Sequence, residues 1–246
     1  MKRTDFQQFY VLPENIRADT FSLFGEEFRH AIKVLRKKKG DGLAAIDGRG
    51  QLYHGIIECI KRDSVQVSIT KIDKDVGEPR IKLTIAQAVP KGQHFDLVVE
   101  KGTEIGVAAF QPILAERCLI DPSSRVERWQ HKALAAAKQC GRSRCPVVHA
   151  PCEFTTIMQD NAFDIALIAH ERIEPAAREI FKNVRNHTNI VVFIGPEGGF
   201  TEKEVQHAVK MGAFPISLGI RRLRSETAAI IAATKILGAL GELGDT

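Results

Sequence analysis

The first third of the chain alternates apolar and polar residues in the way that short β-strands do. Strands are expected over residues 43–46, 52–60 and 65–69. The turn Asp47-Gly48-Arg49-Gly50 between the first two runs predicts a β-hairpin. One short helix is expected at about residues 26–36. Several short strands with one helix are typical of a small β-barrel, which we predict for residues 1–72.

Beyond residue 80 the pattern changes to apolar runs that alternate with amphipathic helices. Expected strands lie at 81–89, 107–114, 164–170, 189–195 and 214–219. Expected helices lie at 94–106, 125–142, 174–184, 201–212 and 226–240. This order predicts a parallel sheet with helices on both faces, and the nearly continuous apolar strands agree with it. The polar segment 73–80 is the expected linker, so the second domain is taken as residues 73–246.

The last expected helix is apolar on nearly every side. From Ala228 to Leu240 only Thr234 and Lys235 interrupt the apolar surface. Such a helix needs burial all round. We expect it to lie partly in the core and partly in a subunit interface.

Composition and charge limit the classes of function that the chain could have. The 246 residues are 44% apolar and carry a net charge of +5. Residues 1–72 hold 13 Lys and Arg against 9 Asp and Glu, whereas the remaining 174 residues hold 22 against 21. A basic module favours a polyanion partner, although a merely solvated surface explains the same bias. No apolar run is long enough to span a membrane and no signal peptide is visible, so we expect a cytoplasmic protein without a membrane partner.

The five cysteines give no sign of a metal site or a disulfide framework. Their number is odd, and no two of them form a CxxC pair. We therefore expect reduced thiols and no metal.

A glycine-rich loop follows the apolar run 189–194. Its sequence is Gly195-Pro196-Glu197-Gly198-Gly199, and Thr201 to Glu204 then forms a capping box that starts a helix. In open α/β sheets, ligands bind beyond the carboxyl ends of the strands. The loop is neither a P-loop nor a Rossmann fingerprint, so a nucleotide phosphate is not indicated. A tight turn with glycines for steric reasons only is the plain alternative.

A second loop, "SLGIRRLRSETAA" at 217–229, also follows a strand. Gly219 ends that strand, and Ser225 is expected as the N-cap of the last helix. Arg221, Arg222 and Arg224 between them suit an anion such as RNA phosphate. Glu226 falls in the first helical turn, where complementing the helix dipole is already a sufficient role.

These two loops together resemble the C-terminal signature of the RsmE family, RNA methyltransferases of the SPOUT superfamily. Three further segments are similar to family motifs, namely "HAIKVLRKKKGD" at 30–41, "KGTEIGV" at 101–107 and "AKQCGR" at 137–142. The resemblance spans most of both predicted domains. It implies methylation of N3 of a uridine in 16S ribosomal RNA of the small subunit, with S-adenosyl-L-methionine as the methyl donor.

The same resemblance implies the architecture and the partners. The fold class is α/β, with an N-terminal PUA-like β-barrel and a C-terminal SPOUT α/β domain that contains a trefoil knot. The implied partners are ribosomal RNA or the small ribosomal subunit, and a second copy of the chain in a homodimer.

Site residues follow by motif. The cofactor contacts carried over are Leu167, His170, Ile194, Gly195, Glu197, Gly198, Gly199, Leu218, Gly219, Ile220 and Leu223. For His170, a hydrogen-bonded histidine at a strand end is an equal alternative. Arg224 is the expected catalytic cation, with a phosphate contact as the alternative, and Glu226 is the expected proton acceptor, with Glu197 as a second candidate. The expected RNA contacts are Arg3, Arg17, Arg29, Lys33, Arg36, Arg142, Arg221 and Arg222, with Lys37, Lys38 and Lys39 as further candidates.

Two other functions stay open on the sequence alone. One is a SPOUT methyltransferase that acts on another RNA position, such as a ribose 2′-hydroxyl. The other is a non-catalytic RNA-binding ribosome assembly factor. A Rossmann-type dehydrogenase is disfavoured because its phosphate-binding glycines are missing.

Overall fold

The computed structural model describes residues 8–118, 123–159, 162–170, 184 and 186–244. The chain forms two compact units, of which the first is Met1–Glu78 with Leu134–Cys145 and the second is Pro79–Ala133 with Pro146–Thr246. The break between Glu78 and Pro79 falls inside the predicted linker 73–80, and strand β5 runs on to Lys74. The helix expected at 174–184 lies outside the described residues except for Val184.

The first unit is built on a five-stranded sheet. Its strands are β1 (Gln8–Tyr10), β2 (Thr20–Phe24), β3 (Gly42–Ile46), β4 (Gln51–Ile60) and β5 (Ser64–Lys74), in the order β1-β3-β4-β5-β2. β1 runs parallel to β3, and the other pairs are antiparallel. The predicted hairpin is confirmed as β3 and β4. Asp47 Oδ1 holds its turn by accepting hydrogen bonds from the backbone N–H groups of Arg49 (2.7 Å) and Gln51 (3.0 Å).

A short helical segment fills one side of this sheet. It consists of α1 (Gly25–Arg29) and the π-helical turn η2 (His30–Val34), whereas a 3₁₀ turn, η1 (Pro13–Asn15), precedes β2. The helix expected at 26–36 is therefore present but ends two residues early, because Arg36 takes a left-handed backbone conformation with φ 55°. Phe28 and Ala31 of this segment pack on Phe9, Phe21 and the other inward side chains of the sheet.

A buried ion pair ties the segment Leu134–Cys145 to the end of the first unit. The guanidinium of Arg142 contacts the carboxylate of Glu78 with an Nη2–Oε2 distance of 2.7 Å, and both side chains are almost fully buried. The expectation that Arg142 contacts RNA is corrected by this geometry, because its charge is already balanced inside the protein. The motif "AKQCGR" thus has a structural role in the first unit.

We expect Glu78→Ala to lower the free energy of unfolding by about 3–5 kcal/mol, since the buried guanidinium loses the carboxylate that balances its charge. Denaturant unfolding followed by circular dichroism measures this. Lys71→Ala is the matched control, because it breaks an exposed pair with Asp73 and should change stability little. Equal losses for the two variants would contradict the structural role of the buried pair.

The second unit is built on a seven-stranded sheet whose paired strands are all parallel. Its strands are β6 (Lys82–Ala88), β7 (Ala109–Leu114), β8 (Val147–Val148), β9 (Cys152–Glu153), β10 (Ile165–Ala169), β11 (Asn189–Ile194) and β12 (Phe214–Ile216). The order is β12-β10-β11-β6-β7-β8, with β9 paired to β7. The predicted parallel sheet is confirmed by each of these ladders.

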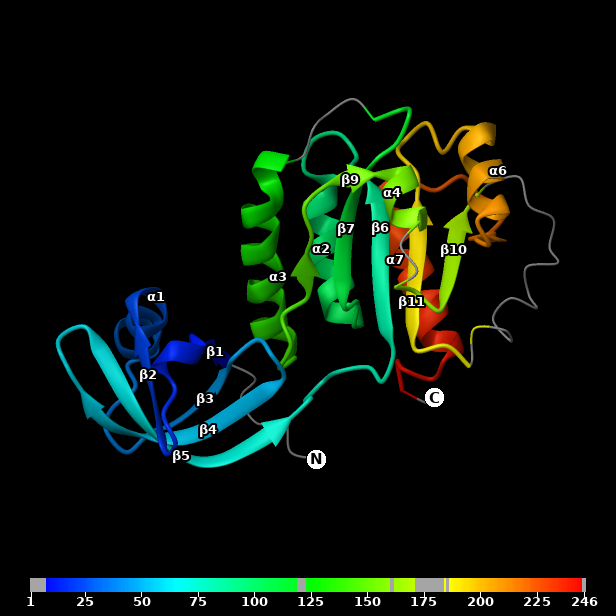
Figure 1. Ribbon diagram of the computed structural model, residues 1–246. Coiled ribbons are helices and arrows are strands. Elements are labelled where there is room, and N and C mark those ends of the chain that lie inside the picture. Colours follow the sequence, from blue (N-terminus) through cyan, green and yellow to red (C-terminus); the bar gives the residue numbers. More distant parts are fainter. Residues whose placement is uncertain (1–7, 119–122, 160–161, 171–183, 185, 245–246) are drawn as a thin grey trace. The chain divides into compact units, whose positions relative to one another are not determined.

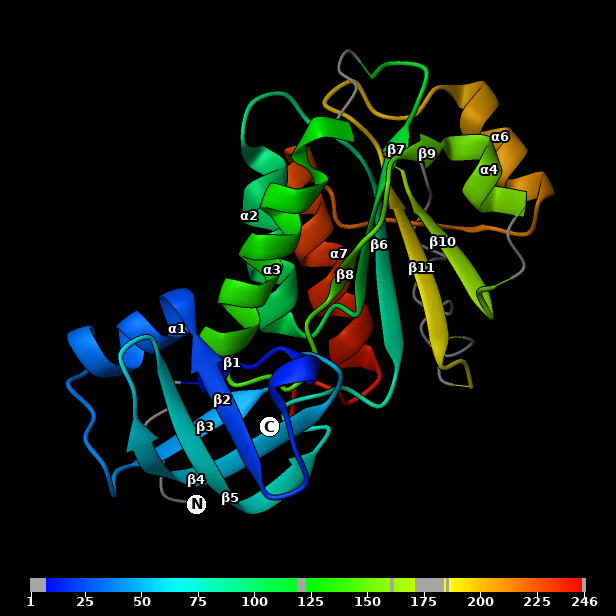
Figure 2. The same cartoon turned by 60° about the vertical axis from the view of Figure 1, so that its left-hand side comes forward.

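Helices cover both faces of this sheet, as the alternation of strands and helices predicts. They are α2 (His94–Ile105), α4 (Phe154–Gln159), α6 (Glu202–Lys210) and α7 (Ser225–Ala239). Helix α3 (Val126–Cys140, preceded by the 3₁₀ turn η3, Ser123–Arg125) begins in the second unit and ends in the first. Figures 1 and 2 show α4 and α6 on one face of the sheet, and α2 and α7 on the other. On the α4 and α6 face, Phe154 stacks edge-on against Phe193 of β11, with ring centroids 5.3 Å apart.

Helix α7 is buried unevenly. Ala229, Ala232, Ala233, Ile236 and Leu237 are fully buried, whereas Ile230 and Ile231 are only partly covered. The apolar surface that the sequence places all round the helix is therefore used on one side by the core of the second unit.

Within the described part of the chain, no helix is both long enough and apolar enough to cross a bilayer. The same residues contain no group of three or more His, Cys, Asp or Glu side chains arranged to hold a metal ion.

Candidate functional site

Four neighbouring strands of the second unit end at one edge of the sheet. Because β12, β10, β11 and β6 are adjacent and parallel, the loops that follow them start side by side. His170 follows β10, and its backbone N–H donates to Ile216 O of β12 at 3.1 Å. This edge is where open α/β sheets bind ligands.

The first glycine loop is folded tightly against itself. The N–H of Gly199 donates to Pro196 O at 2.8 Å, and Gly199 adopts φ +68°, which a side chain disfavours. A Cβ at Gly195 would lie 2.9 Å from the backbone nitrogen of Phe200, so only glycine allows this close approach. The predicted capping box is confirmed, with Thr201 and Glu204 exchanging side-chain and backbone hydrogen bonds at the start of α6.

The second loop is held from α7. Lys235 Nζ donates to Leu218 O at 3.2 Å, and Gly219 adopts φ +135°. The prediction of Ser225 as N-cap is wrong by one residue. Arg224 is the N-cap and makes no capping hydrogen bond with its side chain, while Ser225 is the first helical residue.

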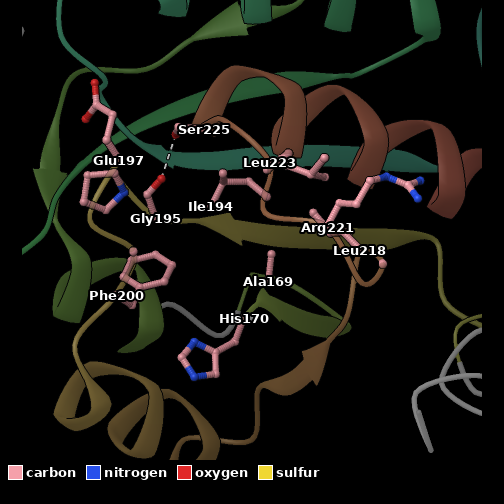
Figure 3. Close-up of a pocket in the computed structure, with 14 residues that line it drawn as sticks. Ala169, His170, Ile194, Gly195, Glu197, Phe200, Leu218, Arg221, Leu223 and Ser225 are labelled. Atoms are coloured by element: carbon pink, nitrogen blue, oxygen red, sulfur yellow. Dashed lines mark hydrogen bonds between the residues drawn. The ribbon is translucent and has the colours of Figure 1, made fainter. Parts of the chain in front are cut away.

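The hydroxyl of Ser225 is used instead to join the two loops. Ser225 Oγ donates to Gly195 O at 2.7 Å (Figure 3) and accepts from Gln87 Nε2 at 2.8 Å. Ser225 begins the helix that follows the second loop, and Gly195 begins the first loop. The Ser225 hydroxyl therefore links the start of α7 to the start of the first loop.

A pocket lies between the two loops. The pocket is open to solvent. The residues expected to bind the cofactor that line it are His170, Ile194, Gly195, Glu197, Gly199, Leu218, Gly219 and Leu223. Figure 3 shows His170 and Phe200 together, apart from Leu218, Leu223 and Arg221, which gather near the second loop.

Three expected cofactor residues do not line this pocket. Leu167 is fully buried inside β10, with its backbone paired to both neighbouring strands. Ile220 is 98% exposed, and Gly198 lines an adjacent cavity. Each of the three lies one or two positions along the chain from a residue that lines the pocket. The family motif, which is read by sequence position, therefore does not separate them from their neighbours.

Six lining residues were not assigned to the cofactor from the sequence. They are Ala169, Pro196, Phe200, Arg221, Ser225 and Ala228. Ala228 lies three residues after Ser225 on α7, so helical periodicity would have found it once Ser225 was assigned. Arg221 was expected to contact RNA, and the structure places it at the rim of the pocket.

The two expected catalytic residues lie beside the pocket rather than in its lining. The carboxylate of Glu226 is 10% exposed, with its Oε1 3.4 Å from Nδ1 of His94, a residue that the sequence did not single out. The side chain of Arg224 is exposed and has no hydrogen bond or ion pair within the described residues. Glu197 Oε1 accepts from the backbone N–H of Lys91 at 2.9 Å, which joins a third loop to the site.

An adjacent cavity carries basic side chains. It is lined by Arg117, His170, Gly198, Gly199, Phe200, Glu202 and Arg222. The guanidinium of Arg117 donates to Gly198 O, and that of Arg222 donates to Glu197 O at 3.4 Å. Arg117 gave no sequence signal, because it follows β7 and only the fold brings it to the glycine loop.

The expected cations of the first unit lie on its surface. Arg17, Arg29, Lys33 and Arg36 are exposed, as are Lys38 and Lys39, and Lys37 is partly buried. Arg17 also donates to Glu14 O at 3.0 Å, and Lys37 to Gly42 O at 3.0 Å. Arg3 lies outside the described residues.

All five cysteines carry free thiols, as expected. Burial raises the pKa of the Cys118 thiol, and burial likewise raises that of Cys152. Both therefore stay protonated at neutral pH and are poor nucleophiles.

Comparison with known proteins identifies the family. A family model described as an RNA methyltransferase domain matches residues 77–237, and one described as an RNA methyltransferase PUA domain matches residues 24–70. A relative from Synechocystis, named ribosomal RNA small subunit methyltransferase E, is 35% identical over 230 residues, covering 92% of this chain and 75% of the relative. The chain belongs to this methyltransferase E family. The Bacillus subtilis member is 31% identical over 232 residues, covering 89% of this chain and 90% of its own.

Solved structures of similar proteins support the assignment to the methyltransferase E family. A Neisseria gonorrhoeae ribosomal RNA small subunit methyltransferase E, bound to S-adenosyl methionine, superposes with a TM-score of 0.84 at 29% identity, covering 94% of this chain and 97% of its own. A Legionella pneumophila putative methyltransferase in complex with the same cofactor gives 0.83 at 29% identity, covering 95% and 97%.

We expect Thr201→Ala to lower the free energy of unfolding by about 1 kcal/mol, because the first turn of α6 loses its capping hydrogen bond. Thr201→Ser keeps the hydroxyl and serves as the control, with most of the stability retained. Urea unfolding of the three proteins checks this. Identical midpoints for Thr201→Ala and wild type would show that the capping box contributes nothing.

Proposed function

We propose that this protein transfers a methyl group from S-adenosyl-L-methionine to N3 of a uridine in 16S ribosomal RNA of the small subunit. The observation that carries the proposal is the single pocket that both glycine loops build, in a chain of the methyltransferase E family. The relatives' names supply the small-subunit RNA, and the resemblance of the two loop motifs supplies the uridine N3.

The residues of the pocket fit the chemistry of S-adenosylmethionine. Ile194, Leu218 and Leu223 offer apolar walls for a flat adenine, and the loop backbone offers hydrogen-bonding groups. Arg221 suits the carboxylate of the methionyl arm, and Glu197 suits its ammonium. When bound, the cofactor would supply an electrophilic methyl group, whose bond to the sulfonium sulfur breaks to leave a neutral thioether as the nucleophile bonds to the methyl carbon.

The residues beside the pocket suit the activation of uridine. N3 carries a proton and is a poor nucleophile until that proton leaves. We assign Glu226 as the proton acceptor and Glu197 as the second candidate. Arg224 is exposed at the end of the second loop, directly before α7, and it stabilises the negative charge that develops on the base.

RNA binding is assigned to exposed cations on both units. Arg17, Arg29, Lys33 and Arg36 suit contacts to the phosphate backbone, which position RNA without reading its sequence. In the second unit, Arg222 and Arg117 line the basic cavity, which shares His170, Gly199 and Phe200 with the cofactor pocket. A phosphate held there would lie close to a base in the pocket.

Three implied properties stay part of the proposal. A homodimer is supported by the partly covered Ile230 and Ile231 on α7. A trefoil knot is supported by the family membership and by the closeness of the two loops at Ser225 and Gly195. The cytoplasm is where assembling ribosomal subunits would meet the enzyme.

The two alternatives are disfavoured by particular features. A non-catalytic assembly factor does not need the tight geometry at Gly195 or a formed pocket. Ribose methylation is disfavoured by the methyltransferase E family, although the same cofactor pocket would serve it.

We expect a strain that lacks this gene to lose one methyl group from N3 of a uridine in 16S RNA, and to regain it with the wild-type gene. Mass spectrometry of digested RNA separates a methylated base from a methylated ribose. A methyl group lost from a ribose would replace the proposal by the first alternative. Calorimetry with S-adenosylmethionine that shows no binding would favour the assembly factor.

We expect Arg224→Ala to lower kcat about 100-fold with the dissociation constant of S-adenosylmethionine unchanged, since the lost cation acts on the base and not on the cofactor. Single-turnover methylation assays and calorimetry measure the two quantities. Arg62→Ala, at an exposed turn of the first unit, is the control. If kcat holds while KM for RNA rises, Arg224 binds phosphate and is not catalytic.

A further inference from the structure

A buried glutamine stands behind the cofactor pocket. Gln87 of β6 is fully buried, and its Nε2 donates to Ser225 Oγ at 2.8 Å. Its Oε1 is also buried and has no hydrogen-bond partner within the described part of the chain. Gln87 does not line the pocket, and no expectation from the sequence concerned it.

The direction of these hydrogen bonds is fixed by chemistry. The carbonyl oxygen of Gly195 can only accept, so the single hydroxyl proton of Ser225 must point to it. The oxygen of Ser225 is then left to accept, and the group that faces it from Gln87 must be the amide NH₂. A carboxylate or an apolar side chain at this position cannot take that role.

The two hydrogen bonds, from Gln87 to Ser225 and from Ser225 to Gly195, connect both walls of the pocket. Gly195 starts the first loop, in a backbone arrangement too tight for a Cβ. Ser225 starts α7 directly after the second loop. Gln87 anchors the shared hydroxyl to β6, the strand that pairs with β11.

We propose that Gln87 is a positioning residue for the methyl donor. It orients the Ser225 hydroxyl, which holds the Gly195 carbonyl and thereby sets the spacing of the two cofactor loops. This inference rests on the proposed function, because it concerns the affinity of the same pocket for S-adenosylmethionine.

The unpaired Oε1 of Gln87 allows an effect on cofactor affinity to be separated from an effect on stability. A buried acceptor without a partner opposes folding, so this glutamine is not explained by stability. Methionine has a similar length and no polar oxygen to bury. Gln87→Met should therefore leave the melting temperature unchanged or raise it, while binding of the cofactor weakens.

The test measures S-adenosylmethionine binding by calorimetry and melting temperature by circular dichroism. We expect Gln87→Met to weaken binding roughly tenfold, the equivalent of one lost hydrogen bond. Ser225→Ala should weaken it at least as much, and the double variant little further, because both changes break one chain. Ser225→Thr keeps a hydroxyl and should recover part of the loss.

Thr84→Val is the matched control, since Thr84 is a buried polar residue of the same strand that faces the opposite side of the sheet. In methylation assays, Gln87→Met should raise KM for the cofactor and leave kcat at saturation nearly unchanged. Wild-type affinity in Gln87→Met would overturn the inference. A lower melting temperature for Gln87→Met would overturn it as well, because stability would then explain the glutamine.

The same experiments distinguish failure of the proposed function from failure of the role of Gln87. Wild-type protein that binds no S-adenosylmethionine would remove the proposed function itself. Wild-type protein that binds and methylates, with variants of equal affinity, would remove only the role of Gln87.

Discussion

The pocket is organised by the hydrogen bond from the hydroxyl of Ser225 to the carbonyl of Gly195 (2.7 Å), with a longer one from Arg222 to the carbonyl of Glu197 (3.4 Å) beside it. The parallel sheet brings the two glycine loops to the same edge, but a sheet alone does not fix how far apart they stand. The shorter bond helps to do so, because Ser225 is the first residue of α7 and Gly195 is the first residue of the other loop. A ligand that touches both loops then meets a cavity whose width is already set, which lowers the entropic cost of binding.

That hydrogen bond in turn requires the order of the strands. β11, which carries the first loop, lies between β10 and β6, and the order along the sheet is not the order along the chain. This arrangement places Gln87 of β6 beside Gly195, which directly follows the neighbouring strand β11, although more than a hundred residues separate the two in sequence. The side chains of β6 alternate between the two faces, so Gln87 points to the α7 side while Ala86 and Ala88 pack with α4 and α6.

The elements were predictable because their signals are local. Periodicity, the Asp47 turn and the Thr201 capping box each depend on residues that are close together in sequence. The elements that they predict are present in the structure. The site was predictable only to the level of its loops. Whether a loop residue faces the pocket, as Gly195 does, or solvent, as Ile220 does, depends on the backbone angles that glycines such as Gly219 permit. Those angles are set by contacts between distant segments, which no local pattern contains.

The basic residues show the same limit in electrostatic terms. A sequence counts Arg142 and Arg224 as equal charges, yet Arg142 is buried against Glu78 and Arg224 is exposed beside the pocket. A guanidinium whose charge is already balanced in a dry environment gains little from a phosphate, because it must first lose its carboxylate. An exposed guanidinium loses only water. The exposed positive charge is therefore smaller than the composition indicates, and among the described residues it includes Arg17, Arg29, Lys33 and Arg36 of the first unit and Arg221, Arg222 and Arg224 of the second glycine loop.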